Sequence, residues 1–267
     1  MNIEGAHYDA DFISADDRAT LAVWLQTIRP IWEERHSRRV VLRPGQSERR
    51  LLRPVYWLGG WQFACLNYYH PPHVIDKVVA AEPFPPVLRR LVDHMEVIAR
   101  DTYSALPDGW CLNTCLINFY GMALRGERWL DTARVGGHHD YEPGPVGSLS
   151  LGAPARFQFA TRHRGPEDRD VVAEEWLTDR SMLLFGTPRL KNELYHRVPR
   201  VSRKGDWSFP VHLDDFQVRR VNFTLRYIPV EHIQPLHTLG AEARGDVEGY
   251  LTELAAHSPF WRDAVDS

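Results

Sequence analysis

One stretch decides the fold: Arg220-Val-Asn-Phe-Thr-Leu-Arg-Tyr227. Neighbouring side chains of a β-strand point to opposite faces of the sheet, so this stretch predicts a strand with one apolar and one polar face. The polar face would carry Arg220, Asn222, Thr224 and Arg226, and the apolar face Val221, Phe223, Leu225 and Tyr227. If the polar face lies inside the fold, its charges need partners, because an isolated buried charge is strongly unfavourable.

Shorter segments before this strand also have strand character. Residues 148–151 and 155–159 alternate between faces, and residues 181–185 form a short apolar run. Asn118 and Tyr120 would likewise share one face of a strand that begins after Cys111. Many short strands separated by turn residues predict a β-sandwich or barrel.

Helices are expected on both sides of this β-region. Residues 14–34 begin with a capping Ser14 and have helical apolar spacing, and Pro30 should end or bend that helix. Residues 86–104 and 246–256 are the other predicted helices. We therefore expect a mainly β fold with flanking α-helices, in one domain that spans residues 1–267.

The composition is that of a globular protein, since 43% of the 267 residues are hydrophobic and 25% are charged. The formal net charge of −3 gives no reason by itself to expect nucleic acid as a partner. Cys65, Cys111 and Cys115 do not form a disulfide framework. Cys111 and Cys115 lack a second Cys or His pair at zinc spacing, and we expect these two to be small core residues. We see no signal-peptide pattern and no apolar run of membrane-spanning length, so we expect a cytoplasmic protein without a membrane partner.

A candidate metal site precedes the decisive strand. His138 and Asp140 would project together from an extended segment, with His139 pointing away, and His196 follows further along the chain. Two imidazoles and one carboxylate can hold one face of a ferrous ion and leave its other positions open. A His-x-Asp triplet also arises by chance, as a surface histidine beside a capping aspartate. The arginine-bearing strand that follows is what favours the metal site.

Two unusual segments lie upstream. Residues 35–53 hold seven arginines, one glutamate and no lysine: Arg35, Arg38, Arg39, Arg43, Arg49, Arg50 and Arg53. This segment is either a solvated loop or edge hairpin, or an anion-binding arm, because arginine favours bidentate contact with phosphate. Residues 54–86 are rich in aromatic residues and prolines, which predicts an irregular lid or clamp.

Taken in order, these motifs resemble AlkB, the family of iron- and 2-oxoglutarate-dependent dioxygenases that remove alkyl groups from nucleic acid bases. Residues 115–120 resemble the strand whose Asn and Tyr bind 2-oxoglutarate, and His138-x-Asp140 resembles the iron-binding pair. Residues 148–159 resemble the stretch after that pair, Tyr195-His196 the distal iron histidine, and Arg220-x-Asn222-x-x-x-Arg226 the most specific motif of the family. The resemblance is strong over residues 113–227 and weaker upstream.

The resemblance implies a jelly-roll (double-stranded β-helix) catalytic core at residues 111–229. Residues 1–110 would form N-terminal helices and a substrate lid, and residues 230–267 a helical extension. His138, Asp140 and His196 would bind Fe(II), with 2-oxoglutarate and O2 as co-substrates. Arg220 would pair with the distant carboxylate of 2-oxoglutarate, helped by Asn118 and Tyr120, and Arg226, supported by Asn222, would lie near its keto-acid end.

The substrate residues implied by the resemblance lie outside this core set. Trp61 would stack on a flipped base and Tyr68 would contact the nucleic acid backbone, although a tryptophan in such a segment often serves only in packing. Glu142 would lie near the substrate base, unless it is simply a solvated glutamate. Segments 121–137 and 199–215 look longer than usual in the family and would reshape the mouth of the site.

Three functions follow from these observations. The first is oxidative dealkylation of DNA or RNA bases. The second is 2-oxoglutarate-dependent hydroxylation of a protein side chain or a small metabolite, which the acidic net charge and the two long segments favour. The third is a non-catalytic binding protein on the same scaffold, against which the intact ligand motifs argue. The alkyl group and the oligomeric state stay open at this stage.

Overall fold

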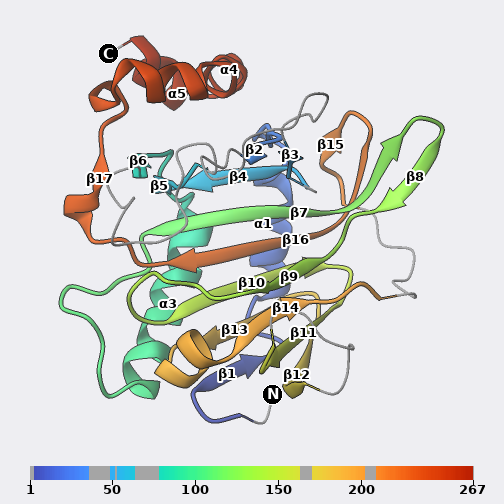
Figure 1. Cartoon of the computed structure of the whole chain (residues 1–267), viewed down its shortest axis with the longest axis vertical. Coiled ribbons are helices and arrows are strands. Elements are labelled where there is room, and N and C mark those ends of the chain that lie inside the picture. The colour runs from blue at the N-terminus through green and yellow to red at the C-terminus, as the bar shows by residue number, and fades with distance from the viewer. Residues whose placement is uncertain are drawn as a thin grey trace.

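The computed structural model describes residues 3–35, 49–51, 53–63, 78–162, 170–201 and 209–266. Within these ranges a larger and a smaller antiparallel sheet pack against each other, and two helices lie behind the larger sheet (Figure 1). The expectation of a mainly β fold with flanking helices and a jelly-roll core is therefore confirmed. No described helix combines the length and apolarity needed to cross a membrane.

The larger sheet runs in the order β1 (Ala6–Asp9), β13 (Ser181–Phe185), β10 (Val146–Gly152), β16 (Phe216–Arg226), β7 (Thr114–Arg125) and β4 (Val55–Leu58). Two further strands extend it, β15 (His212–Leu213) beside β16 and β8 (Arg128–Asp131) beside β7. The smaller sheet runs in the order β12 (Val171–Leu177), β11 (Ala155–Ala160), β14 (Tyr195–Val198) and β9 (Val135–His138).

The remaining described elements surround these sheets. Strands β2 (Glu34–Arg35) and β3 (Arg49–Arg50) pair, and β17 (Ile233–Gln234), β6 (Val78–Ala80) and β5 (Gly60–Trp61) form a small sheet. The helices are α1 (Ala15–Trp24), α3 (Pro86–Thr102), α4 (Ala241–His257) and α5 (Pro259–Asp266). The short turns are η3 (Arg189–Glu193), η4 (Val230–His232) and η5 (Leu236–Thr238).

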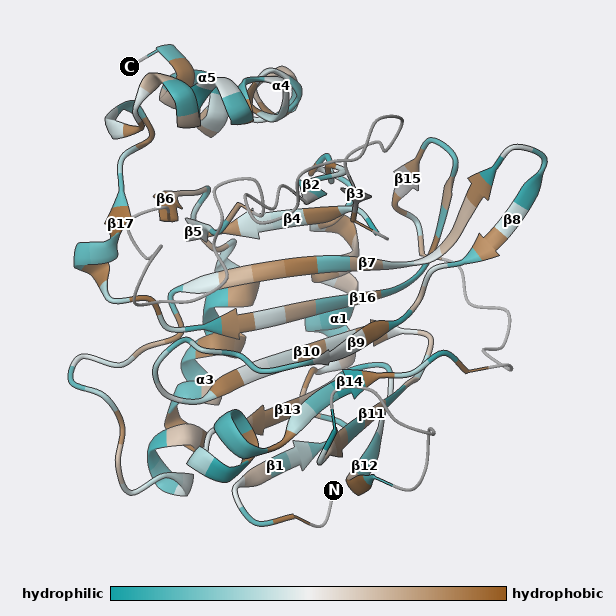
Figure 2. Ribbon diagram, in the orientation of Figure 1, coloured by the Kyte–Doolittle hydropathy of each residue, from teal (hydrophilic) through white to brown (hydrophobic). Residues whose placement is uncertain are grey.

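The two faces of β16 differ as its sequence predicts. Val221, Phe223 and Leu225 are fully buried in a core that includes Leu88 and Val92 of α3. Hydrophobic residues recur along β7 and β16 (Figure 2). The polar residues of β16 lie on the opposite face, toward the smaller sheet, and this arrangement leaves room between the sheets for a site.

The first helix is shorter than predicted. Ser14 caps α1, accepting a hydrogen bond from the Asp17 amide at 3.0 Å, but the helix ends at Trp24, well before Pro30. The chain beyond is drawn into the sheet, because Ile31 exchanges two backbone hydrogen bonds with Val55 at 2.9 and 2.8 Å. The prediction of a helix over residues 14–34 is therefore wrong at its C-terminal end. Residues 86–104 are helical up to Thr102, and the C-terminal helix α4 is longer than predicted.

The prediction of an irregular lid over residues 54–86 is also wrong where the structure describes that segment. Val55–Leu58 form β4, a fully buried strand paired with β7, and Gly60–Trp61 form β5. A short run of β-branched and aromatic residues pairs readily with a neighbouring strand, despite the proline before it and the glycine after it. Residues 64–77 lie outside the described ranges.

Gly121 on β7 allows the close approach of β16 on which this sheet depends. A Cβ atom added there would lie 1.9 Å from the backbone oxygen of Gln217, beside the irregularity between Val218 and Arg220. We expect Gly121→Ala to lower the free energy of unfolding by about 1–3 kcal/mol, measured by chemical denaturation. Gly249→Ala is the matched control, because nothing lies within 4 Å of its added Cβ in α4, and it should be neutral or stabilising. Equal stability of the two variants would contradict this account.

Candidate metal and co-substrate site

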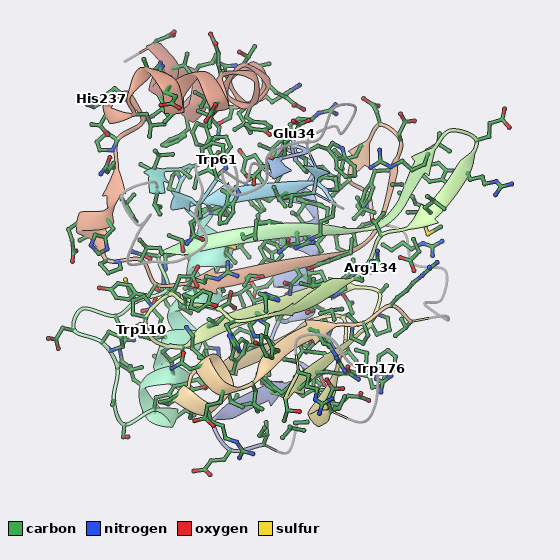
Figure 3. All side chains as sticks on the ribbon, in the orientation of Figure 1. Glu34, Trp61, Trp110, Arg134, Trp176 and His237 are labelled. Atoms are coloured by element: carbon green, nitrogen blue, oxygen red, sulfur yellow. The ribbon has the colours of Figure 1, made fainter. Side chains whose placement is uncertain are left out.

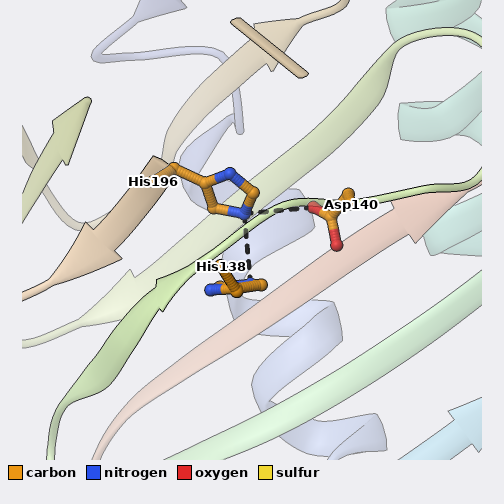
Figure 4. Close-up of side chains that lie close together, drawn as sticks. All are labelled: His138, Asp140 and His196. Atoms are coloured by element: carbon orange, nitrogen blue, oxygen red, sulfur yellow. Dashed lines mark hydrogen bonds and ion pairs between the residues drawn. The ribbon is translucent and has the colours of Figure 1, made fainter. Parts of the chain in front are cut away.

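Three side chains that can bind a metal converge between the two sheets. His138 is the last residue of β9, His196 lies in β14, and Asp140 follows the end of β9. The Nε2 atom of His196 lies 3.1 Å from Nε2 of His138 and 3.2 Å from Oδ2 of Asp140. The three ligand atoms lie within 4.8 Å of one another (Figure 4).

This spacing fits a divalent metal ion. Two ligand atoms in adjacent octahedral positions, each about 2.1 Å from the ion, lie about 3.0 Å apart. The Nδ1 atom of His138 is 2.9 Å from the backbone oxygen of Gly136, so this nitrogen carries the proton and Nε2 presents its lone pair. Two imidazoles and one carboxylate are also the donor set of ferrous sites that keep open positions. The residues present therefore fit iron in number, chemistry and spacing.

The protonation states suit metal binding. Burial, and then the neighbouring His196, lowers the pKa of His138 to about 3. Burial alone would raise the pKa of Asp140, but Arg226 and His196 outweigh it and hold that pKa well below its usual range. At neutral pH His138 is therefore neutral and Asp140 is ionised, which are the forms that bind a metal.

The directions of His139 and Asp140 agree with the prediction, although both residues lie beyond the end of β9. The His139 ring stacks on Tyr195, with 4.2 Å between ring centroids, and points away from His196 as predicted. Asp140 lies beyond the end of β9, where strand alternation no longer applies. Its Oδ1 instead accepts hydrogen bonds from Nε and Nη2 of Arg226, at 3.1 and 2.8 Å. The predicted convergence is right, but a side chain from β16 brings it about.

A buried lysine fixes the loop after Asp140. Lys191 lies in η3, a π-helical turn between β13 and β14, and its Nζ donates to the backbone oxygens of Glu142 and, at 2.8 Å, Gly144. Burial lowers the pKa of Lys191, and the nearby carboxylates of Asp140 and Glu142 oppose that shift. Sequence reasoning missed this residue, because a single lysine beside Leu190 carries no motif.

The polar face of β16 is hydrogen-bonded to β10. Nη2 of Arg220 donates to Oγ of Ser150 at 2.9 Å. Nδ2 of Asn222 donates to Oγ of Ser148 at 2.8 Å and to the backbone oxygen of Leu149 at 2.9 Å. These contacts hold both side chains in the space between the sheets.

The neighbouring strand β7 supplies the other two expected co-substrate residues. The register places Asn118 opposite Asn222, and Tyr120 opposite Arg220. The Arg220 guanidinium lies 5.0 Å from the centroid of the Tyr120 ring. The structure thus brings Asn118, Tyr120, Arg220 and Asn222 to one place, as their spacing in the sequence suggested.

A cavity opens beside Tyr120 and Arg220. Its empty volume is about 330 Å³, and it is also lined by Ala153, Pro154 and Val198. The cavity therefore offers a place for a small anionic ligand at the Arg220 end of β16.

Comparisons with known proteins agree with this geometry. A sequence profile described as the 2OG-Fe(II) oxygenase superfamily matches residues 5–226. The chain belongs to the 2OG-Fe(II) oxygenase superfamily. Its members depend on Fe(II), 2-oxoglutarate and O2, so the chain is a dioxygenase and the expected cofactor and co-substrates are confirmed.

The chain is also similar to several solved structures. OsALKBH1 matches with a TM-score of 0.53 and 17% identity, over 85% of this chain and 100% of that chain, which confirms an AlkB-like fold. YcfD of E. coli matches with a TM-score of 0.32 and 10% identity, over 97% of this chain and 67% of that chain. A bsmA homolog of Methylobium petroleophilum PM1 matches with a TM-score of 0.38 and 13% identity, over 84% and 88%. No curated protein sequence matches the chain.

The structure does not support the expected stacking role of Trp61. This side chain is fully buried, and its indole Nε1 donates to Oε1 of Glu33 at 2.7 Å. It packs edge-on against Trp261 of α5, with ring centroids 5.0 Å apart, and Figure 3 shows it on the side of α4 and α5. The expectation is corrected, because α5 covers the ring that would have to meet a base. Tyr68 lies outside the described residues.

Glu142 lies beside the metal-binding residues and is buried rather than solvated. Its Oε1 is 3.4 Å from Nε of Arg226 and accepts a hydrogen bond from Nε2 of Gln62 at 3.1 Å. Sequence reasoning missed Gln62. The one usable indication was side-chain alternation. If Trp61 points into the core, the next residue of an extended segment points to the opposite face.

The metal assignment can be tested with two adjacent histidines. We expect His138→Ala to abolish Fe(II) binding and to reduce turnover at least about 100-fold, because one of three protein ligands is lost. His139→Ala should retain both, since His139 stacks on Tyr195 and faces away. Metal content after reconstitution and titration calorimetry with Mn(II) measure the binding. Loss of metal in the His139 variant alone would overturn the assignment.

The metal-free protein should lose stability as pH falls. Unfolded His138 takes up a proton near its ordinary pKa of 6.5, whereas the folded side chain does so only near pH 3, so the unfolded state binds more protons between these values. The free energy of unfolding therefore decreases from pH 6.5 toward pH 3, and the Asp140 contribution begins to fall near its ordinary pKa of 3.8 and continues to fall below it. Denaturant melts of His138→Gln should show a shallower decrease than those of His139→Gln. Identical slopes would contradict the role of His138.

Proposed function

We propose that this dioxygenase removes alkyl groups, methyl in the first instance, from nucleic acid bases. The observation that carries this choice is the position of Glu142, whose buried carboxylate lies beside the Arg226–Asp140 pair. By resemblance to the AlkB family, an acidic residue at this position lies next to the substrate base. The motifs over residues 113–227 support the same assignment.

In this proposal His138, Asp140 and His196 hold Fe(II). When bound, Fe(II) with 2-oxoglutarate and O2 supplies the oxidation of a C–H bond to an alcohol, coupled to release of carbon dioxide and succinate. Arg226 keeps the Asp140 carboxylate ionised and oriented through two hydrogen bonds. A carboxylate ligand at this position favours hydroxylation over halogenation, because it leaves no room for a chloride.

The co-substrate would lie along the inner face of β16. Arg220 pairs with its distant carboxylate, because the guanidinium fork matches a carboxylate in geometry and charge. Tyr120 and Asn118 on β7 support that end, and Asn222, held by Ser148, supports the other. In this proposal the reacting end of the co-substrate would lie near Asp140 and Arg226.

Hydroxylation explains how an alkyl group would leave. An N-methyl group that gains a hydroxyl becomes a hemiaminal, which breaks down to the free base nitrogen and formaldehyde. A base in a duplex would first have to leave the stack. In this proposal Gln62 and Glu142, which hydrogen-bond to each other, would contact it.

A second candidate is hydroxylation of a protein side chain or a small metabolite by the same machinery. The burial of Trp61 favours it, because the one aromatic residue expected to stack on a base is committed to the core. The net charge of −3 points in the same direction.

A substrate panel separates the two candidates. With Fe(II), 2-oxoglutarate and O2, we expect loss of methyl mass from methylated single-stranded DNA or RNA, with formaldehyde released in equal amount. Glu142→Gln should lower this turnover by about 10-fold or more while leaving Fe(II) binding intact, since Glu142 is not one of the three ligands. Succinate release with peptides or metabolites, and none above background with any methylated oligonucleotide, would overturn the nucleic acid proposal in favour of the second.

A further inference from the structure

The two arginines of β16 differ in their partners. Arg226 pairs with Asp140, with 2.8 Å between Nη2 and Oδ1. Arg220 is buried, donates to the neutral hydroxyl of Ser150, and forms no ion pair with a carboxylate of any described residue. A buried guanidinium without an anionic partner is unfavourable, which indicates that an external anion completes this end of the site.

A second arginine lies at the same place. The guanidinium of Arg53 is 5.0 Å from the centroid of the Tyr120 ring, the same distance as that of Arg220. Its Nε donates to Oδ1 of Asn118 at 2.7 Å. Two cations and one phenol therefore surround the position at which the proposed function places the distant carboxylate of 2-oxoglutarate.

The backbone holds Arg53 in this position. Arg53 directly precedes β4, and the backbone oxygen of Pro54 accepts a hydrogen bond from the Phe119 amide at 3.1 Å. In the next register position Val55 lies opposite Asn118. Pairing between β4 and β7 thus fixes the backbone next to Arg53, on the side of β7 away from β16.

Its contacts suit a positioning role. The hydrogen bond to Oδ1 fixes the orientation of the Asn118 amide, so that Nδ2 is directed away from Arg53. The Arg53 guanidinium also lies over the Tyr120 ring, and this cation–π contact restricts the position of the phenol. Two neighbouring positive charges also repel, and a bound carboxylate relieves that repulsion.

We propose that Arg53 is a positioning residue for the co-substrate, which orients Asn118 and Tyr120 and adds a second positive charge at the distant carboxylate of 2-oxoglutarate. The inference rests on the proposed assignment of Arg220 to that carboxylate. It gives one arginine of the 35–53 segment a role inside the site rather than in contact with nucleic acid. Arg38, Arg39 and Arg43 lie outside the described residues, and so do the side chains of Arg35, Arg49 and Arg50.

Binding of two keto acids tests this role without any turnover. 2-Oxoglutarate and 2-oxopentanoate share the keto-acid end, but only the first has a distant carboxylate. Calorimetry of the Mn(II)-loaded protein should show that Arg53→Gln weakens 2-oxoglutarate about 10-fold, the effect of one charge-assisted interaction. The same variant should leave the affinity for 2-oxopentanoate unchanged. Unchanged affinity for 2-oxoglutarate, or an equal loss for both acids, would overturn the inference.

Three further variants serve as controls for the Arg53→Gln experiment. Arg53→Lys should recover part of the lost affinity because it keeps the charge, and no recovery would contradict the electrostatic part of the role. Arg90→Gln, on α3 and paired with Asp17, is a matched arginine outside the site and should bind both acids normally. Arg220→Gln distinguishes failure of the Arg220 assignment from failure of the Arg53 role. If it does not weaken 2-oxoglutarate, the assignment of Arg220 fails, whereas a loss in Arg220→Gln without one in Arg53→Gln rejects only the role of Arg53.

Discussion

The site depends on one constraint, namely that β16 turns a cationic face into the space between two sheets. Its other face is fully apolar and is buried against α3, so the strand cannot rotate to expose its arginines without exposing Phe223 and Leu225. Arg220 and Arg226 must therefore be accommodated inside. The buried hydroxyls on β10 and the carboxylate after β9 are placed to meet them.

The arginines at the two ends of this face have different partners, and this difference makes the two ends of the site chemically distinct. At the Arg226 end the protein supplies its own anion, Asp140, which in turn lies 3.2 Å from His196. A divalent ion adds positive charge there, and the carboxylate can neutralise part of it because Arg226 keeps it ionised. At the Arg220 end no described carboxylate forms an ion pair, and a cavity adjoins the guanidinium. The two ends of the site therefore differ because Asp140 pairs with Arg226, whereas no described carboxylate pairs with Arg220.

Local periodicity predicted the parts of this site that lie within strands. The faces of β16 and the shared face of Asn118 and Tyr120 follow from alternation, since pleated geometry extends along a strand without outside help. The position of Asp140 could not be predicted in this way, because contacts from β16 and η3 hold its loop. The early end of α1 depends on the pairing of Ile31 with Val55. Non-local contacts of this kind leave no local pattern in the sequence.

Trp61 illustrates the same limit on the substrate side, and its burial changes what recognition requires. With the indole bonded to Glu33 and covered by Trp261, stacking on this ring is not available to a substrate. Under the proposed function, recognition beside Asp140 would then depend on hydrogen bonds from Gln62 and Glu142, an amide and a carboxylate in direct contact. A nucleobase edge and an amide side chain both present donors and acceptors that such a pair can bind. The two proposed substrate classes therefore share their chemistry at this point, and contacts to the rest of the substrate, above all to phosphates, must distinguish them.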